Sequence, residues 1–357
     1  PKLRVSDGPA GVRGSRTDGP ASMNVPCGTA LAATWDTSMI REVGELLGRE
    51  LLAKGARVHL APTVNLHRTP IGGRNFECLS EDPLLTALIA VEYVKGVQSN
   101  GVASCIKHFV GNDTEFERMT IDSQIDERTL RELYLVPFER AVADAEVMSI
   151  MTAYNRVNGP FAADSVWLLQ EVLRDEWNFD GLVMSDWFGL HSTAEGVIAG
   201  CDLEMPGPAL HRGQKLLDAV AAGEVSAEAV TACARRVLEL MERTGGLHQP
   251  PGAETTRDDA DDLALLRRAS AAGMVLLKND NHTLPLDATV EMGSVAVIGP
   301  NAAHGMVMGG GSAHVTPTRI SHPLDAFTTT LSARGIKVQH APGCNINKKL
   351  PELDTRL

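Results

Sequence analysis

Short apolar runs alternate with longer amphipathic stretches along the chain, and this rhythm constrains the fold more than any other feature. The runs "VASCIKHF" (102–109), "VMSIMTAYN" (147–155) and "GLVMSDW" (181–187) begin without polar alternation. Strands buried on both faces have this pattern, and such strands form parallel sheets. Strands that alternate with helices over about 200 residues predict a (β/α) barrel, with an open doubly wound sheet as the alternative.

Helix signals separate the apolar runs. The stretch "EDPLLTALIAVEYVKGVQSNG" (81–101) has Asp82 in position to cap a helix and Pro83 at the first helical position. A second helix is predicted within "DSVWLLQEVLRDEW" (164–177), with Asp164 as its N-cap. Each of these helices leads into the next apolar run.

Polar side chains collect where the apolar runs end. In a (β/α) barrel the carboxyl ends of the strands share one rim, and enzymes with this fold place their active sites there. The pattern therefore favours the barrel over the open sheet. The residues at these ends are Asn65, Lys107 and His108, Tyr154 and Asn155, Asp186, and Glu204.

The charge balance points to a neutral small-molecule partner. The 357 residues carry a formal net charge of −12 and no block of Lys and Arg. Nucleic acids and anionic membranes both need a concentrated basic surface, so we expect neither as a partner. No run of apolar residues is long enough for a transmembrane helix. A homo-oligomer is compatible with this composition.

The cysteines give no sign of a disulfide scaffold or a metal site. Six are scattered without a CxxC pair. Cys105 and Cys201 lie in apolar runs and are interpreted as small buried hydrophobic residues, with a reactive thiol as the alternative. There is no HExxH motif either. We expect no metal and no cofactor.

The composition predicts two domains. Residues 1–245 form the predicted barrel, and residues 246–262, rich in Gly, Pro, Thr and Asp, are interpreted as a linker. Residues 263–357 are predicted to begin an α/β sandwich. Within them, "SVAVIGPNA" (294–302) suggests a dinucleotide site, but no GxGxxG follows it, and the glycines of "GMVMGGGSAH" (305–314) favour a tight turn instead.

The two ends of the sequence suggest that the chain is truncated. The sequence opens almost directly on a strand-like "LRVSD" and closes abruptly at "LPELDTRL". We therefore expect truncation at both ends. Under this expectation, the lack of a signal peptide at the start of the sequence does not indicate where the protein is located. A cytoplasmic location is our expectation.

Asp186 and Trp187 form the most informative pair. An Asp after a strand often caps the next helix, but Ser192 is better placed to start the helix near Thr193. A carboxylate beside a large aromatic face suits the anomeric carbon and the apolar face of a pyranose ring. The residues alone leave capping and catalysis both open for Asp186.

Two cationic positions on the rim have competing interpretations. Lys107 is costly to bury unpaired, so Lys107 and His108 are predicted either to grip sugar hydroxyls or carboxylates, or to include a Schiff-base lysine. Arg74 lies in a loop after a strand. It either binds a ligand or forms an ion pair with Glu77 or Glu81.

Three further side chains are candidates for the site. Asp7 and Arg13 lie in the Gly- and Pro-rich loop "SDGPAGVR", where an ordinary Asx-turn would also explain Asp7. The hydroxyl of Tyr154 could reach the carboxylate of a neighbouring strand, and a purely structural tyrosine is the alternative.

Six motifs, in this order, resemble glycoside hydrolase family 3 and are most similar to its β-glucosidases: "SDGPAGVRG", "GGRNFECLSEDP", "KHFVGNDTEFER", "MTAYNRVNG", "GLVMSDWFG" and "AGCDLEMPGP". The resemblance continues through "LLKNDNHTLPL" and "VAVIGPNA" to "GGGSAHVTP" and so covers nearly the whole chain.

The resemblance implies a retaining, exo-acting β-glucosidase that removes terminal nonreducing β-D-glucosyl residues from β-glucosides or oligosaccharides. The nucleophile would be Asp186. Alternatives are a β-xylosidase or another glycosidase of the family, or a sugar-binding barrel without full activity. The resemblance assigns Met151 to the sugar pocket, whereas the residue pattern alone would place it in the hydrophobic core. The implied pocket residues are Asp7, Arg13, Arg74, Lys107, His108, Met151, Tyr154, Trp187 and Ser312.

The sequence departs from the family pattern at the general acid/base. A retaining mechanism needs a second carboxyl group about 5–5.5 Å from the nucleophile. The family's β-glucosidases supply this Glu from well beyond the "GGGSAH" turn, and no matching motif occurs in residues 320–357. Another branch uses a His, which "GNDTEFER" lacks. We therefore expect no acid/base in this chain. The segment "NKKLPELD" (347–354) resembles the point where some members insert a β-rich carbohydrate-binding module.

Overall fold

The computed structural model describes residues 2–286 and 293–345. It separates into two compact units: unit 1 comprises residues 1–275 and 310–318, and unit 2 comprises residues 276–309 and 319–357. The segment 347–354, interpreted above as an insertion point, lies outside the described residues.

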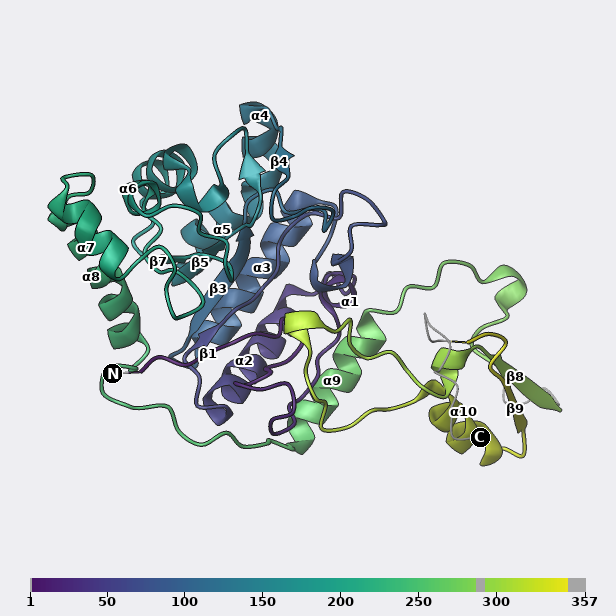
Figure 1. The fold of residues 1–357 in the computed structure, drawn as a ribbon. Helices are drawn as coiled ribbons and strands as arrows, with labels where there is room; N and C mark the ends of the chain where they lie inside the picture. Colours follow the sequence, from purple (N-terminus) through teal and green to yellow (C-terminus); the bar gives the residue numbers. More distant parts are fainter. Residues whose placement is uncertain (1, 287–292, 346–357) are drawn as a thin grey trace, which may run out of the picture. The chain divides into compact units, whose positions relative to one another are not determined.

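A parallel sheet runs through unit 1, and its strands lie in the order β1-β2-β3-β5-β7 (Figure 1). A parallel bridge between Met184 and Leu203 continues this order. The strands follow one another in chain order without a switch point, which is how a (β/α) barrel winds and a doubly wound sheet does not. The strands are β1 (Val5–Ser6), β2 (Val58–His59), β3 (Ala103–Phe109), β5 (Ser149–Thr152) and β7 (Leu182–Met184).

The strands are buried on both faces, as their apolar runs predicted. Every residue of β3 is buried. Ile106 packs into the core that the sheet shares with the helices. Cys105, Met151 and Met184 pack into a second core. Because neighbouring residues of a strand point to opposite sides, these two cores lie on the two faces of the sheet.

Two long helices, α2 (Thr37–Ala53) and α3 (Pro83–Gln98), pack against each other (Figure 1). Asp82 caps α3 by accepting from the N–H groups of Leu84 and Leu85 at 2.7 and 2.9 Å, so the predicted cap is confirmed. Glycine allows the close approach of the two helices. A Cβ on Gly44 would lie 2.9 Å from the Cα of Gly96.

The predicted cap at Asp164 is wrong. The helical segment η4 begins at Trp167, and the hydroxyl of Ser165 accepts from the N–H of Leu168 at 3.3 Å. The carboxylate of Asp164 instead accepts from the hydroxyl of Ser192 at 2.6 Å. Ser165 lies one residue nearer the helix, so its short side chain reaches the free N–H group.

The other described elements of unit 1 are short or peripheral. A two-stranded parallel ribbon pairs β4 (Asp122–Ser123) with β6 (Arg156–Val157). The remaining helices are α1 (Gly28–Ala32), α4 (Glu127–Thr129), α5 (Val136–Ala145), α6 (Ala194–Ala199), α7 (Gln214–Ala221), α8 (Ala227–Arg243) and α9 (Ala260–Ala272). Short or irregular helical segments are η1 (Asn75–Glu77), η2 (Leu130–Tyr134), η3 (Ala162–Asp164), η4 (Trp167–Glu176) and η7 (Gly311–Ala313). Among the described residues, no helix combines the length and the apolar character needed to cross a bilayer.

The segment interpreted as a linker is tied to unit 1 by polar contacts. The buried Lys54 ammonium donates to the carbonyls of Pro20, Ala21 and Thr255 at 2.5, 2.9 and 3.0 Å. The N–H of Thr255 donates in turn to the carbonyl of Ala53 at 2.9 Å. The following helix, α9, packs on α2. These contacts explain why unit 1 continues to residue 275, beyond the predicted domain end at residue 245.

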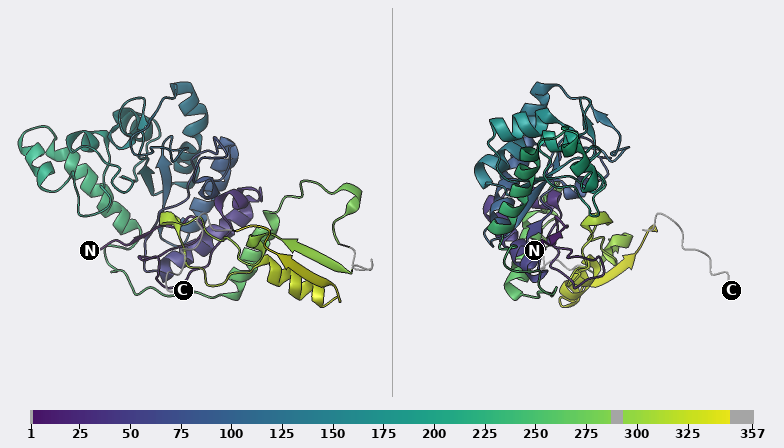
Figure 2. Two further views of the ribbon diagram at one scale, coloured as in Figure 1. Left: turned by 45° about the vertical axis from the view of Figure 1, so that its right-hand side comes forward. Right: turned by 60° about the vertical axis from the view of Figure 1, so that its left-hand side comes forward.

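Unit 2 consists of a parallel strand pair and a helix. The strand β8 (Ser294–Ile298) pairs with β9 (Lys337–Ala341), and α10 (Pro323–Ser332) packs along β9 (Figure 2). Its 3-10 turns are η5 (Asp280–His282) and η6 (Pro300–Ala302).

Replacing Lys54 with Met should destabilise unit 1 by about 3 kcal/mol, because three carbonyl groups lose the buried ammonium group that donates to them. Urea unfolding monitored by tryptophan fluorescence measures this change. The exposed Lys215 of α7 provides the control, and Lys215→Met should leave the free energy of unfolding nearly unchanged. Equal stability of the two variants would contradict the assigned role of Lys54.

Candidate active site

A cavity of about 280 Å³ lies at the carboxyl ends of the strands of unit 1. All ten residues predicted for the site line it. The other two lining residues were not predicted from the sequence: Leu60 follows β2, and Arg118 lies in the loop after β3. The lining residues are Asp7, Arg13, Leu60, Arg74, Lys107, His108, Arg118, Met151, Tyr154, Asp186, Trp187 and Ser312.

The parallel sheet explains why distant residues meet here. Asp7 follows β1, and Asp186 lies two residues after β7. Lys107 and His108 are consecutive in β3, and regular alternation would point them to opposite faces. The register between β3 and β5 shifts between Ile106 and Phe109, and both side chains line the cavity.

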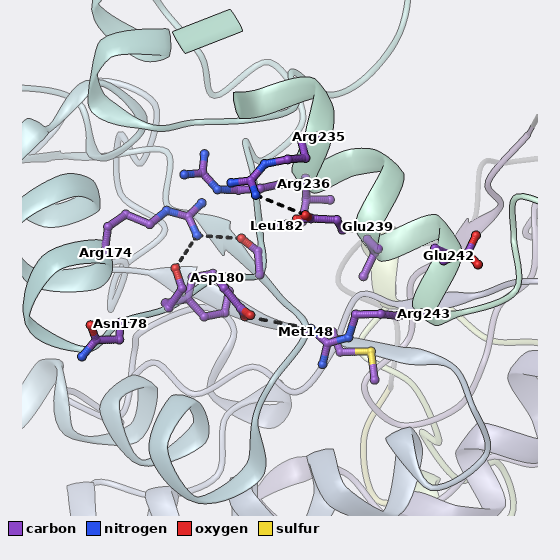
Figure 3. A pocket seen from close by; sticks show the side chains of 13 residues that line it. Met148, Arg174, Asn178, Asp180, Leu182, Arg235, Arg236, Glu239, Glu242 and Arg243 are labelled. Carbon is purple, nitrogen blue, oxygen red and sulfur yellow. Dashed lines mark hydrogen bonds and ion pairs between the residues drawn. The ribbon is translucent and has the colours of Figure 1, made fainter. Parts of the chain in front are cut away.

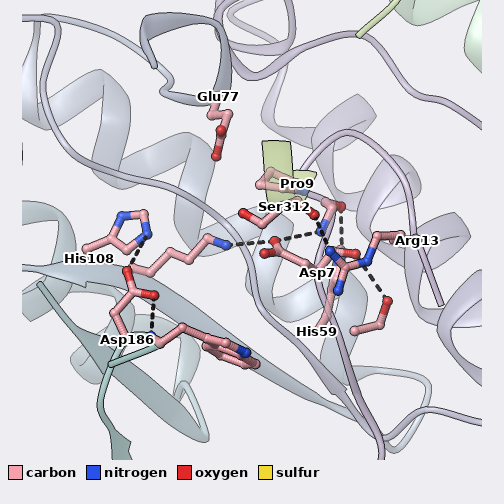
Figure 4. Close-up of polar contacts among 12 residues, drawn as sticks. Asp7, Pro9, Arg13, His59, Glu77, His108, Asp186 and Ser312 are labelled. Atoms are coloured by element: carbon pink, nitrogen blue, oxygen red, sulfur yellow. Dashed lines mark hydrogen bonds and ion pairs between the residues drawn. The ribbon is translucent and has the colours of Figure 1, made fainter. Parts of the chain in front are cut away.

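Asp186 is a buried carboxylate whose two oxygens have different surroundings. Its Oδ1 accepts from the N–H of Trp187 at 2.7 Å. Its Oδ2 lies 3.4 Å from Nε2 of His108 (Figure 4). Burial raises the pKa of Asp186 above its ordinary value, although the charge of Lys107, the N–H of Trp187 and the Tyr154 hydroxyl offset part of the rise. The Tyr154 hydroxyl, at the end of a neighbouring strand, favours the ionised form of this carboxylate.

His108 is neutral, and its surroundings fix its tautomer. Burial, followed by the charges of Arg74 and Lys107, lowers its pKa far below the ordinary value. Its Nδ1 lies 3.1 Å from Oδ1 of Asn65, an acceptor oriented by the hydrogen bond from the Asn65 amide to the His108 carbonyl. Nδ1 therefore carries the proton, and Nε2 is an acceptor facing Arg74 at 3.5 Å. The contact with Asp186 is thus not a charged pair, and Oδ2 stays free for chemistry.

Lys107 forms a buried ion pair with Asp7. Their Nζ and Oδ1 atoms are 2.8 Å apart. Burial alone would raise the pKa of Asp7, but the charge and hydrogen bond of Lys107, with the N–H of Gly8, outweigh burial and hold the pKa below its ordinary value. Lys107 therefore grips a carboxylate, one of the two predicted roles. Because Asp7 engages the ammonium group, the geometry gives no support to a Schiff-base lysine.

Arg74 forms the predicted ion pair with Glu77 and also faces the cavity, whereas its binding of a ligand stays a prediction. Its guanidinium donates to both carboxylate oxygens of Glu77, at 3.1 and 2.9 Å, and it also lines the cavity. Burial would lower the pKa of Arg74, but the charge of Glu77 outweighs burial and raises it. Glu81, the other predicted partner, is exposed. The bidentate pair fixes the plane of the guanidinium.

Ser312 belongs to unit 1, although its sequence position places it in the predicted second domain. The segment 310–318 pairs with the N-terminal region: Ser22 donates its N–H to the carbonyl of Thr316 at 2.9 Å, and Thr318 donates to Ser22 at 3.0 Å. The carbonyl of Ser312 accepts from the Arg13 guanidinium at 2.8 Å (Figure 4). The glycine-rich turn thus brings a backbone carbonyl group to the cavity.

Met151 lines the cavity and Glu204, at the end of another apolar run, does not. Met151 is 2% exposed, packs in a core and also lines the cavity, so the interpretations as core and as pocket residue both hold. The rim carboxylate Glu204 does not reach the cavity lining. It accepts from the N–H groups of Leu210 and His211, at 2.7 and 3.0 Å, and so shapes a loop.

A larger cavity, of about 540 Å³, lies at the opposite ends of the strands (Figure 3). Met148 and Leu182 line it at the amino ends of β5 and β7. Two of its arginines, Arg174 and Arg236, already donate to Asp202 at 2.8 and 2.9 Å. Because (β/α) barrels place their chemistry at the carboxyl ends of the strands, the smaller cavity is the candidate active site.

Two cysteines of the barrel, Cys105 and Cys201, are buried as predicted. Cys105 and Cys201 have no exposed surface, and burial raises the pKa of the Cys105 thiol to about 12. In the part of the chain that the structure describes, no three His, Cys, Asp or Glu side chains gather as a metal-binding group.

The fold and the site define a (β/α)-barrel protein with a polar cavity at the carboxyl ends of its strands. The chain belongs to glycosyl hydrolase family 3. Residues 9–240 match the N-terminal domain of this family, and residues 274–350 match its C-terminal domain. The first match identifies unit 1 as the family's TIM-like barrel, and the second contains the α/β elements of unit 2.

Similar proteins are β-glucosidases. One from Rhizobium radiobacter is 53% identical over 351 residues, which cover 98% of this chain and 42% of that protein. The crystal structure of β-glucosidase from Kluyveromyces marxianus in complex with glucose is 40% identical, with a TM-score of 0.91 over 97% of this chain and 42% of that one. β-Glucosidase 3B from Thermotoga neapolitana in complex with glucose is 36% identical, with a TM-score of 0.85 over 95% and 48%. The chain spans less than half the length of these relatives.

Asp113 should make stability depend on pH. Its carboxylate accepts from the N–H of Leu66 at 3.1 Å, and burial raises its pKa from 3.8 to about 6. Because the folded pKa exceeds the unfolded one, the stability from this group is present at low pH and is lost as the pH rises from about 4 to about 6.

The variant Asp113→Asn lacks this titration. Across that pH range the free energy of unfolding of the wild type, minus that of the variant, should fall by roughly 2 kcal/mol. Urea unfolding of both proteins at several pH values measures the difference. A difference independent of pH would show that Asp113 titrates normally.

Proposed function

We propose that this protein is a retaining, exo-acting β-glucosidase that cleaves terminal nonreducing β-D-glucosyl residues through a covalent intermediate on Asp186. One observation carries the proposal: Asp186 presents a free Oδ2 to a cavity whose other walls are Trp187, Tyr154 and hydrogen-bonding cations. The β-glucosidase relatives, two of which hold glucose, support the same substrate.

The charges around the cavity suit an uncharged sugar. Among the described residues, those that line the cavity and their ion-pair partners comprise four carboxylates and four cations, which sum to zero. A neutral hexose therefore enters without an uncompensated charge. The carboxylates are Asp7, Glu77, Glu115 and Asp186, and the cations are Arg13, Arg74, Lys107 and Arg118.

The chemistry follows from the position of Asp186. Its Oδ2 attacks the anomeric carbon, the bond to the leaving-group oxygen breaks, and a glycosyl ester forms. Water then attacks the anomeric carbon from the face that the leaving group left and displaces the Asp186 carboxylate, so two inversions retain the configuration. The N–H of Trp187 holds Oδ1 at 2.7 Å and so limits rotation of the carboxylate. Fixing the attacking atom in this way reduces the entropy lost on reaching the transition state.

The leaving group needs a proton from another residue. Within the described residues, the carboxyl groups that line the cavity are Asp7 and Asp186. Asp7 is paired with Lys107, which helps hold its pKa below the ordinary value, so it is unsuited to donate a proton. Glu77 is likewise held by both of its oxygens on Arg74. The expectation that the acid/base lies outside this chain stays a prediction.

Treatment with 2-deoxy-2-fluoro-β-D-glucosyl fluoride should label Asp186 covalently. Fluoride leaves without a proton donor, so the test depends on the nucleophile alone, and the 2-fluoro group slows hydrolysis of the ester. Mass spectrometry of the digested protein should find one added 2-fluoroglucosyl group on the peptide that contains Asp186. Asp186→Asn, which keeps the shape of the side chain, should not be labelled.

Other outcomes separate the alternative functions. A label on a residue other than Asp186 would overturn the assignment of the nucleophile. Faster labelling by the corresponding xylosyl fluoride would favour a β-xylosidase. Binding of glucose in calorimetry without any labelling would favour a sugar-binding barrel.

The rate of labelling should fall with acid at a midpoint above 3.8, because burial raises the pKa of Asp186 above that ordinary value and only the carboxylate attacks. Lys107→Met should move the midpoint to higher pH, since the ammonium favours the ionised form of Asp186. Rates measured between about pH 3 and 8 test both statements. A midpoint unchanged by Lys107→Met would show that Lys107 does not act on Asp186.

A further inference from the structure

Glu115 lies outside the cavity lining but contacts two residues within it. Its Oε2 accepts from Nη1 of Arg118 at 2.6 Å, and its Oε1 lies 3.9 Å from Nη1 of Arg74. Its backbone N–H donates to the carbonyl of Gly72 at 3.2 Å. One residue therefore joins the loop that carries Arg74 to the loop that carries Arg118.

The two loops approach so closely that a glycine is required opposite Glu115. Gly73 has a φ of +93°, which favours glycine. A Cβ on Gly73 would lie 2.7 Å from Cγ of Glu115. The contact is thus built into both loops and does not depend on the ion pairs alone.

Arg118 extends this contact to the nucleophile. Its guanidinium carbon lies 4.8 Å from the ring centroid of Tyr154, within the range of a cation–π contact. Tyr154 lines the same cavity as Asp186, and its hydroxyl favours the ionised form of that carboxylate. Burial, followed by the charge of Asp186, raises the pKa of Tyr154, and Arg118 opposes this rise. A cation held on the ring therefore strengthens this effect of the hydroxyl on Asp186.

We propose that Glu115 is a positioning residue: it anchors Arg118 on the ring of Tyr154, next to the loop of Arg74, and thereby sets the position of the Tyr154 hydroxyl in the cavity that it shares with Asp186. The inference rests on the proposed function, because its consequence is the reactivity of Asp186. The side chains act in the order Glu115, Arg118, Tyr154 and Asp186.

Two substitutions of Glu115 distinguish the effect of its contact with Arg118 from the effect of its negative charge. Glu115→Ala releases Arg118, so Tyr154 loses its cation and its hydroxyl loses its fixed position. Glu115→Gln keeps an oxygen that can accept from Arg118, but it removes one negative charge from a balanced cluster. The uncompensated positive charge favours the ionised form of Asp186 and should lower its pKa.

The experiment measures the maximal rate of labelling by 2-deoxy-2-fluoro-β-D-glucosyl fluoride, its pH midpoint, and the affinity for glucose by calorimetry. Glu115→Ala and Arg118→Ala should each label roughly tenfold more slowly, and the double variant should be no slower than either, because both changes break one contact. Glu115→Gln should keep most of the rate and shift the acid midpoint to lower pH. The matched control is Glu132→Ala, which removes an exposed i,i+4 pair with Arg128 at 2.9 Å and should leave all three quantities unchanged.

Two results would overturn the role of Glu115. One is a Glu115→Ala protein that labels and binds glucose like the wild type. The other is a double variant whose loss is the product of the two single losses. If the wild type itself is not labelled, the proposed function fails, and glucose affinity alone decides the inference. Glu115→Ala and Arg118→Ala should then weaken glucose binding by the same factor, and any other result contradicts the anchoring of Arg118.

Discussion

The buried ion pair between Lys107 and Asp7 is the interaction on which the site depends. It spans 2.8 Å and joins the end of β1 to β3, two strands separated in the sheet by β2. A pair of buried charges is stable only with good geometry and further hydrogen bonds, and Asp7 gains one from the N–H of Gly8 at 2.8 Å. The pair therefore requires that the carboxyl ends of these strands converge. That convergence is what creates a cavity with Asp186 on its wall.

The electrostatics of the cavity follow from burial opposed by fixed charges. Burial raises the pKa of Asp186 and lowers that of His108. Lys107 and Arg74 act in the opposite direction on Asp186 but in the same direction on His108. The result is a carboxylate beside a neutral imidazole. A protonated His108 would bind Oδ2, the oxygen that the proposed reaction needs, so the cations that favour ionised Asp186 also keep its attacking atom free.

Much of the site could be predicted because a buried strand that ends in a polar side chain is visible in one sequence. Asp186, Lys107 and Tyr154 all follow this pattern, and Asp82 marks its helix by a capping side chain. The misses have different physical origins. Arg118 lies in an irregular loop, and its role depends on Glu115 and Tyr154, which only the fold brings together. Ser312 was predicted for the pocket but assigned to the second domain, because the segment 310–318 joins the barrel through backbone hydrogen bonds to Ser22, and the pattern of side chains does not show backbone bonds. The stretch after residue 245 has the composition of a linker, but Lys54 holds it from a distant helix.

The central claim is that separate strand ends converge so that Oδ2 of Asp186 faces a hexose. A crystal structure of the protein after reaction with 2-deoxy-2-fluoro-β-D-glucosyl fluoride tests it most directly. The account predicts a covalent bond from Oδ2 to the anomeric carbon, with the sugar in the cavity of about 280 Å³ and Lys107 still paired with Asp7. A sugar bound in the larger cavity at the amino ends of the strands, or an ester on any other carboxylate, would contradict it.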